Sequence, residues 1–151
     1  MTATTTAVET SKDWFEELKG WIDGDVCVVT IPLNPVPASR PKVSKWGTYY
    51  TKTYATWKRQ VKFHLPNHDA MWPDKRQELI VFAEFVVQKA RTSKLLFPRG
   101  DVDNYAKAAY DAITKSGSFW YDDDQLTLSV EHKRFAQEGE QPHTELTIIC
   151  P

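Results

Sequence analysis

The fold is decided by two neighbouring stretches of the sequence, residues 78–89 (ELIVFAEFVVQK) and residues 101–115 (DVDNYAKAAYDAITK). The first stretch is long and rich in Val, Ile and Phe, so it predicts a strand. In the second stretch, apolar residues recur at the spacing of one helix face, namely Ala106, Ala109, Tyr110 and Ile113. A strand followed by an amphipathic helix over about 103–115 predicts a helix that packs against a sheet.

The elements on either side of these stretches complete one small domain. Helical spacing predicts helices at 10–22 and 54–65, and β-branched or alternating residues predict strands at 26–31, near 126–130 and near 146–150, with a short strand or hairpin arm at 47–50. Prolines make 32–41 an extended loop. The predicted fold class is α+β, with a mixed β-sheet and two core helices. We expect residues 25–151 to form this domain and residues 1–24 to add an N-terminal tail and an amphipathic helix outside it.

Composition excludes several classes of protein. The chain has 151 residues, of which 41% are hydrophobic and 26% charged, so a wholly disordered chain is excluded. No apolar run approaches the length of about 20 residues that a membrane span needs, and residues 1–8 do not resemble a signal peptide. Two cysteines, Cys27 and Cys150, cannot form a disulfide framework. We therefore expect a cytoplasmic protein with no membrane partner.

The net charge of −1 hides an uneven distribution. Residues 40–107 carry a charge of +8, whereas residues 1–39 carry −4 and residues 108–151 carry −5. The basic segment, Arg40–Lys62, contains no acidic residue, and five aromatic residues are interleaved with its lysines and arginines. Basic side chains neutralise phosphates and aromatic rings stack on bases, so this segment is a candidate nucleic-acid surface. The alternative is a solvated basic face with a few core aromatics.

Two groups of carboxylates are candidate metal ligands. The first is Asp101 and Asp103, with Lys107 one helical turn further on, and the second is the run 122–124 at the turn before the next strand. A helix of about 12 residues is about 18 Å long, so the chain must return after it if the two groups are to meet. If they meet, their mutual repulsion calls for a cation, and oxygen-only ligands favour Mg²⁺ or Mn²⁺. Such a site can activate water and stabilise a phosphodiester in transit, with Lys107 supplying positive charge.

Each of these residues also has a purely structural interpretation. An Asp at a helix start is a common N-cap, which would account for Asp101 or Asp103 alone. Three aspartates at a turn are usually solvated surface, and Lys107 at an exposed helical position would usually be a solvated lysine. Asp111 lies two turns beyond Asp103, and we interpret it as structural.

The two acidic groups together resemble a known family. The run Asp101-Val-Asp103-Asn104-Tyr-Ala-Lys107, followed by Trp120-Tyr-Asp122-Asp123-Asp124-Gln125, is similar to the RusA family of Holliday junction resolvases, small Mg²⁺-dependent endodeoxyribonucleases of phages and prophages. Upstream, Arg40-Pro-Lys42 and Tyr49-Tyr-Thr51 are similar to the early loop of the family and its Tyr-Thr step. The likeness covers about residues 26–150.

This resemblance implies a homodimer that binds branched DNA, a four-way junction, and nicks two strands symmetrically. It implies metal binding by Asp101, Asp103 and Asp123, with Asp122 adjacent, and a catalytic role for Lys107. Our candidates for DNA contact are Arg40, Lys42, Lys45, Lys58, Lys94 and Arg99. The alternatives are a flap or single-strand endonuclease that uses the same site, and a non-catalytic DNA-binding protein.

Overall fold

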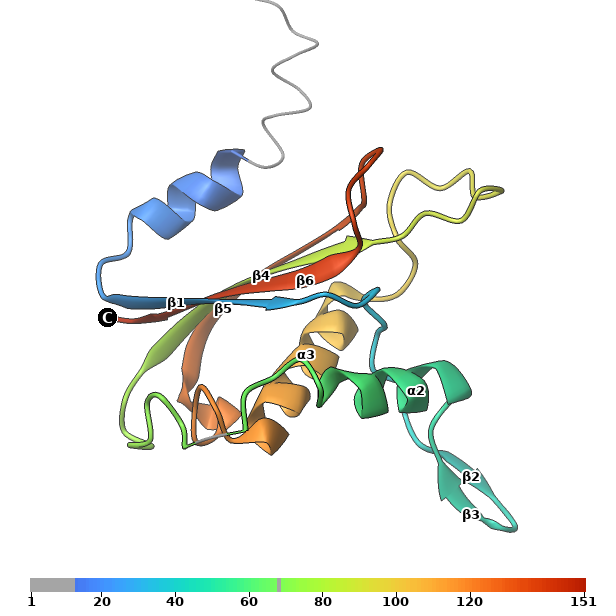
Figure 1. Cartoon of the computed structure of the whole chain (residues 1–151), viewed down its shortest axis with the longest axis horizontal. Coiled ribbons are helices and arrows are strands. Elements are labelled where there is room, and N and C mark those ends of the chain that lie inside the picture. The colour runs from blue at the N-terminus through green and yellow to red at the C-terminus, as the bar shows by residue number, and fades with distance from the viewer. Residues whose placement is uncertain (1–12, 68) are drawn as a thin grey trace, which may run out of the picture.

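The computed structural model describes residues 13–67 and 69–151 (Figure 1). Residues 13–20 are helical, and the remaining elements follow in chain order: β1 (Asp25–Ile31), β2 (Lys42–Ser44), β3 (Gly47–Tyr49), α2 (Lys52–Val61), β4 (Leu79–Val87), α3 (Val102–Ser116), the 3₁₀ turn η1 (Asp123–Gln125), β5 (Leu126–Phe135) and β6 (His143–Cys150). The predicted small α+β domain is confirmed. None of the described helices is long and apolar enough to span a bilayer.

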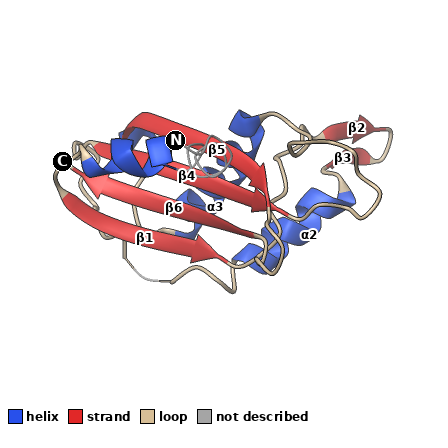
Figure 2. Cartoon of the chain, turned by 90° about the horizontal axis from the view of Figure 1, so that it is seen from above, coloured by secondary structure: helices blue, strands red, loops and turns tan. Residues whose placement is uncertain are grey.

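The main sheet is mixed, as predicted, and has the strand order β1-β6-β4-β5. β4 and β5 run parallel and are joined through α3, whereas β6 is antiparallel to both β1 and β4. β2 and β3 form a separate antiparallel hairpin. The main sheet lies between two helical layers, with α3 and α2 on one face and the helix at 13–20 on the other (Figures 1 and 2).

The strand β4 and the helix α3 form the centre of the core. Every residue of β4 is buried, because β4 is an inner strand with both faces covered. On α3 the four residues of the predicted helix face are all buried: Ala106, Ala109, Tyr110 and Ile113. The helix at 13–20 covers the opposite face of the sheet, where the ring of Phe15 packs edge-on against Phe82. The start of the predicted first helix, residues 10–12, lies outside the described residues.

The first helix ends at residue 20 instead of 22, and two further elements differ from their predicted form. The helix predicted at 54–65 spans Lys52–Val61 instead, and the chain continues in turns because the N–H groups of Phe63 and His64 bond three residues back. β5 was predicted to alternate regularly, but its register against β4 shifts between Leu79 and Ile80. The shift is a bulge that sends Leu128 to the opposite face from Leu126, and Leu128 is consequently 46% exposed.

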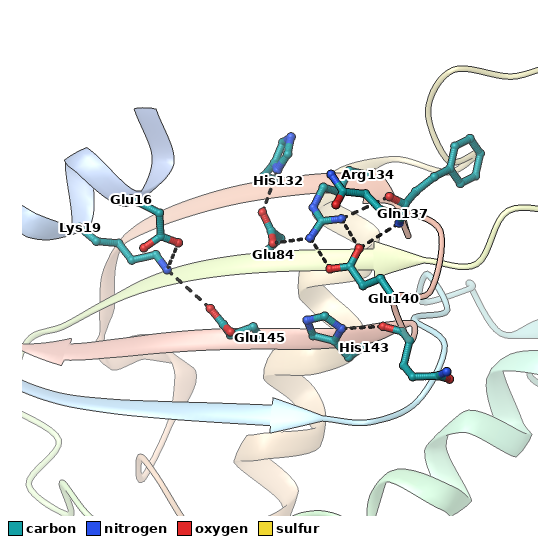
Figure 3. A network of polar contacts seen from close by, with 11 residues as sticks. Glu16, Lys19, Glu84, His132, Arg134, Gln137, Glu140, His143 and Glu145 are labelled. Carbon is teal, nitrogen blue, oxygen red and sulfur yellow. Dashed lines mark hydrogen bonds and ion pairs between the residues drawn. The ribbon is translucent and has the colours of Figure 1, made fainter. Parts of the chain in front are cut away.

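A polar network lies on the sheet face opposite α3 (Figure 3). The nearly buried Glu84 accepts a hydrogen bond from Arg134 at 3.3 Å and lies 3.3 Å from His132 Nδ1. Arg134 also donates to both carboxylate oxygens of Glu140, at 2.6 and 2.8 Å, and these bonds hold the pKa of Glu140 down at about 2. The network ties the β5–β6 connection to the sheet without involving either acidic group.

Candidate active site

The second acidic group forms a compact cluster at the start of β5. One carboxylate oxygen from each of Asp122, Asp123 and Asp124 lies within 4.8 Å of the others. The main chain causes this convergence, since the residues form a 3₁₀ turn in which the side chain of Asp122 accepts a hydrogen bond from the N–H of Asp124 at 3.1 Å. The three carboxylates, which we call the acidic cluster, are therefore held together by their own turn.

Gln125 fastens the acidic cluster to the rest of the fold. Its side chain is 2% exposed, and its Oε1 accepts hydrogen bonds from the N–H groups of Tyr121 and Asp122. Its Nε2 donates to three backbone carbonyls of the preceding loop, those of Trp72, Asp74 and Gln77. A single amide thus joins two segments about fifty residues apart in sequence.

Replacing this amide is expected to destabilise the fold. Gln125→Ala leaves buried carbonyl and N–H groups without partners, which should lower the free energy of unfolding by about 2–4 kcal/mol. Urea denaturation measures the change, and Gln60→Ala on the exposed side of α2 is the matched control, expected to change stability by less than about 0.5 kcal/mol. Equal stabilities for the two variants would show that Gln125 has no clamping role.

The electrostatics of the acidic cluster favour a bound cation. Burial raises the pKa of Asp123, and the neighbouring Asp122, Asp111 and Asp124 raise it further. The N–H of Asp124 lowers the pKa of Asp122, since it donates a hydrogen bond to that carboxylate. An all-oxygen set of crowded carboxylates suits a hard divalent cation such as Mg²⁺ or Mn²⁺. The residues present therefore fit a divalent metal.

The first acidic group lies at the N-terminus of α3. Asp101 occupies the N-cap position, yet its side chain makes no capping hydrogen bond, so capping does not account for its carboxylate. Asp103 and Lys107 are exposed on the first two turns. The Pro-rich loop packs beside them, since Ala38 donates its N–H to the carbonyl of Asn104 at 2.9 Å. This contact brings the start of the basic segment to the same end of α3.

The two acidic groups lie at opposite ends of β5. Lys133, near the end of this strand, donates to the carbonyls of Pro98 and Gly100, directly before Asp101. The acidic cluster precedes the first residue of the strand, Leu126. Lys133 lies seven residue steps beyond Leu126, a length of about 23 Å along the strand. The turn after α3 therefore does not bring the two groups together within one chain.

The candidate DNA-binding residues lie on three parts of the chain: the hairpin with the loop before it, α2, and the β4–α3 loop. Arg40 lies in the loop before β2, Lys42 in β2 and Lys45 at the turn of the hairpin, which projects away from the sheet beside α2 (Figure 1). Trp46 at this turn is 86% exposed, and the Lys45 ammonium lies 5.0 Å from its ring centroid. Lys58 is on α2, and the exposed Lys94 and Arg99 are in the β4–α3 loop. An exposed aromatic ring beside lysines is the arrangement expected of a nucleic-acid surface.

Sequence reasoning gave no role to several residues that matter for the site. Gln125 stood within the recognised motif, and its position three residues after Asp122, the spacing of a capping box, was the available signal. Asp111 was interpreted as structural, but its negative charge helps to raise the pKa of Asp123. Lys115 was assigned no function, although its side chain on α3 lies close to that of Lys58 on α2. The spacing of 111 and 115 along one face of the predicted helix was the available signal.

Comparison with known proteins identifies a family whose model covers most of the chain. The family model described as Endodeoxyribonuclease RusA matches residues 32–149, which is most of the chain. The matched range contains both acidic groups, Lys107 and the basic segment. No curated protein matches the chain.

Proposed function

Because the chain belongs to the RusA family of endodeoxyribonucleases, which resolve Holliday junctions, we propose that it is a Mg²⁺-dependent homodimer that cuts four-way junctions by paired, symmetric nicks. Residues 25–151 form the nuclease domain in this proposal, and residues 1–24 add a tail and a helix. The single observation that carries the metal-dependent part is the acidic cluster, in which three carboxylates lie within 4.8 Å of one another.

The proposed roles follow from residue chemistry. Asp101, Asp103 and Asp123 would hold the metal, with Asp122 beside them, and Mn²⁺ should replace Mg²⁺ because both prefer carboxylate oxygen. The bound metal would supply Lewis acidity at the phosphate and lower the pKa of a water molecule. Lys107, exposed one turn from Asp103, would offer its ammonium to the negative charge that grows on the phosphate oxygens.

The proposed ligand set requires two copies of the chain. Ligand atoms of one Mg²⁺ lie about 2.1 Å from the ion, so two groups at opposite ends of a strand segment about 23 Å long cannot share it. A two-fold dimer that places the α3 N-terminus of one subunit against the acidic cluster of the other would complete two equivalent sites. We therefore propose that each metal site draws Asp101 and Asp103 from one subunit and Asp123 from its partner.

The basic hairpin gives a prediction about binding. Lys42→Ala combined with Lys45→Ala should weaken binding to every DNA and flatten the dependence of binding on salt, because two phosphate contacts and their released counterions are lost. The proposed dimer loses these two contacts in each of its subunits, so the slope of log K against log salt should fall in magnitude by about four. Titrations at a series of salt concentrations measure it, and an unchanged slope would show that the hairpin does not contact DNA.

One assay tests the proposed function against its rivals. The protein is incubated with Mg²⁺ on a four-way junction, a flap and a linear duplex, and the products are read on a denaturing gel. Symmetric cuts confined to the junction support the proposal. Preferred cutting of the flap would identify a flap endonuclease with the same site, and binding without any cut would favour a DNA-binding role.

A further inference from the structure

A cavity of about 600 Å³ lies between α2 and α3, next to the acidic cluster. Its walls come from residues 50–67 and 108–116. Asp111 lines the cavity, and its charge also raises the pKa of Asp123 in the acidic cluster. The volume falls in the range of pockets that enclose small organic ligands, about 300–1,000 Å³. A molecule bound there would lie beside the proposed metal site.

The charges that line this cavity favour an anion. Four cationic residues face one carboxylate, that of Asp111; the cations are Lys58, Arg59, Lys62 and Lys115. Lys58 and Lys115 approach each other from the two helices, and the pKa of Lys58 is lowered first by burial and then by the contact with Lys115. Two adjacent ammonium groups repel each other unless an anion lies between them, and a phosphate provides that charge.

Aromatic rings adjoin the paired lysines. The Lys58 ammonium lies 4.2 Å from the ring centroid of Tyr50 and 5.3 Å from that of Tyr54. The rings of Tyr54 and Trp57 are stacked, with an interplanar angle of 22°. Tyr50 is 39% exposed and so retains surface that a further ring can contact. Cations beside aromatic rings are the combination that binds single-stranded nucleic acid, phosphate to lysine and base to ring.

The indole of Trp57 provides an independent sign of a ligand. Trp57 lines the cavity and is 4% exposed, and its buried Nε1 has no hydrogen-bond partner among the described residues. The indole of Trp120, by contrast, donates to Thr114 Oγ1 at 2.8 Å. A buried donor without a partner is costly, so an acceptor from outside the chain, a water molecule or a bound ligand, would stabilise it.

We propose that the cavity between α2 and α3 binds one unpaired nucleotide of the DNA strand that runs to the acidic cluster. The phosphate lies between Lys58 and Lys115, the base lies against the aromatic wall, and Trp57 Nε1 donates to an acceptor on the nucleotide. A base that is stacked and paired within a duplex cannot enter a protein cavity, so the nucleotide leaves its duplex, which costs least where strands already exchange partners. This inference rests on the proposed function, since it assigns the cavity to the same substrate.

The test follows the indole N–H of Trp57 by ¹H–¹⁵N correlation spectroscopy of the full chain, with Trp57→Phe used to assign the signal. A short single-stranded oligothymidylate should shift this signal, and Lys115→Gln should weaken the binding about ten-fold through loss of a charge-assisted contact. Lys89→Gln, an exposed lysine outside the cavity, should bind as the wild type does.

Three kinds of result would overturn the inference. No shift, or an equal shift with a blunt duplex, would show that the cavity does not take an unpaired nucleotide. Thymidine monophosphate or inorganic phosphate binding as tightly as the oligothymidylate would indicate a site for a free anion. An unchanged affinity of the Lys115→Gln variant for oligothymidylate would show that the lysine pair does not contact the nucleotide. If oligothymidylate shifts the Trp57 signal of the wild-type protein but the protein cuts no junction, the proposed function is wrong. The assignment of the cavity to an unpaired nucleotide would still hold.

Discussion

Asp103→Asn is expected to abolish cleavage of a four-way junction while leaving binding of the junction intact. The substitution keeps the shape of the side chain but removes the negative charge that the proposed metal site needs. A bound metal stabilises the transition state by several kcal/mol, so its loss should lower the rate of cleavage by about a thousand-fold or more. Binding should persist because it depends on the basic segment, and removing one negative charge reduces repulsion between protein and phosphate.

The measurement is single-turnover cleavage at saturating enzyme, with binding followed separately in Ca²⁺ or without metal. Asp23→Asn is the matched control, since Asp23 is exposed and precedes β1, outside both acidic groups. It should cut at the wild-type rate. If the Asp103→Asn protein also cuts at that rate, the first acidic group does not belong to the active site. The acidic cluster would then be the remaining candidate.

Most of the fold could be predicted because its elements carry their own patterns. β4 is apolar throughout since both of its faces are covered, and α3 buries the face that its spacing indicates. The exceptions depend on contacts made elsewhere. The bulge in β5 is set by its register against β4, and the early end of α2 reflects turns that local spacing does not reveal.

The residues of the candidate site could be predicted, but their arrangement could not. Motif spacing selected the candidates Asp101, Asp103 and the run 122–124, because so many carboxylates close together repel one another and a bound cation offsets that repulsion. The distance between the two groups depends on whether the chain after α3 turns back or continues into a parallel strand. It continues, since β5 pairs parallel with β4, and a parallel strand begins at the far end of the connecting helix.

That separation leads to a second large expected effect, a recovery of activity from two inactive proteins. Asp103→Asn and Asp123→Asn should each be inactive alone, whereas a mixture that has exchanged subunits should cut DNA. In a mixed dimer with shared sites, one site receives both substitutions and the other receives neither. Equal mixing makes about half of the dimers mixed, so about a quarter of the sites should be intact.

An intact site in a mixed dimer makes single nicks, so the readout is nicking of a junction strand on a denaturing gel. If each subunit instead carried a complete site, every site in every mixed dimer would hold one substitution and the mixture would stay inactive. Mixing Asp103→Asn with Asp101→Asn is the matched control, because both residues belong to the same end of α3. That pair should stay inactive in either arrangement, so recovery confined to the first mixture would place the two acidic groups on different subunits of one site.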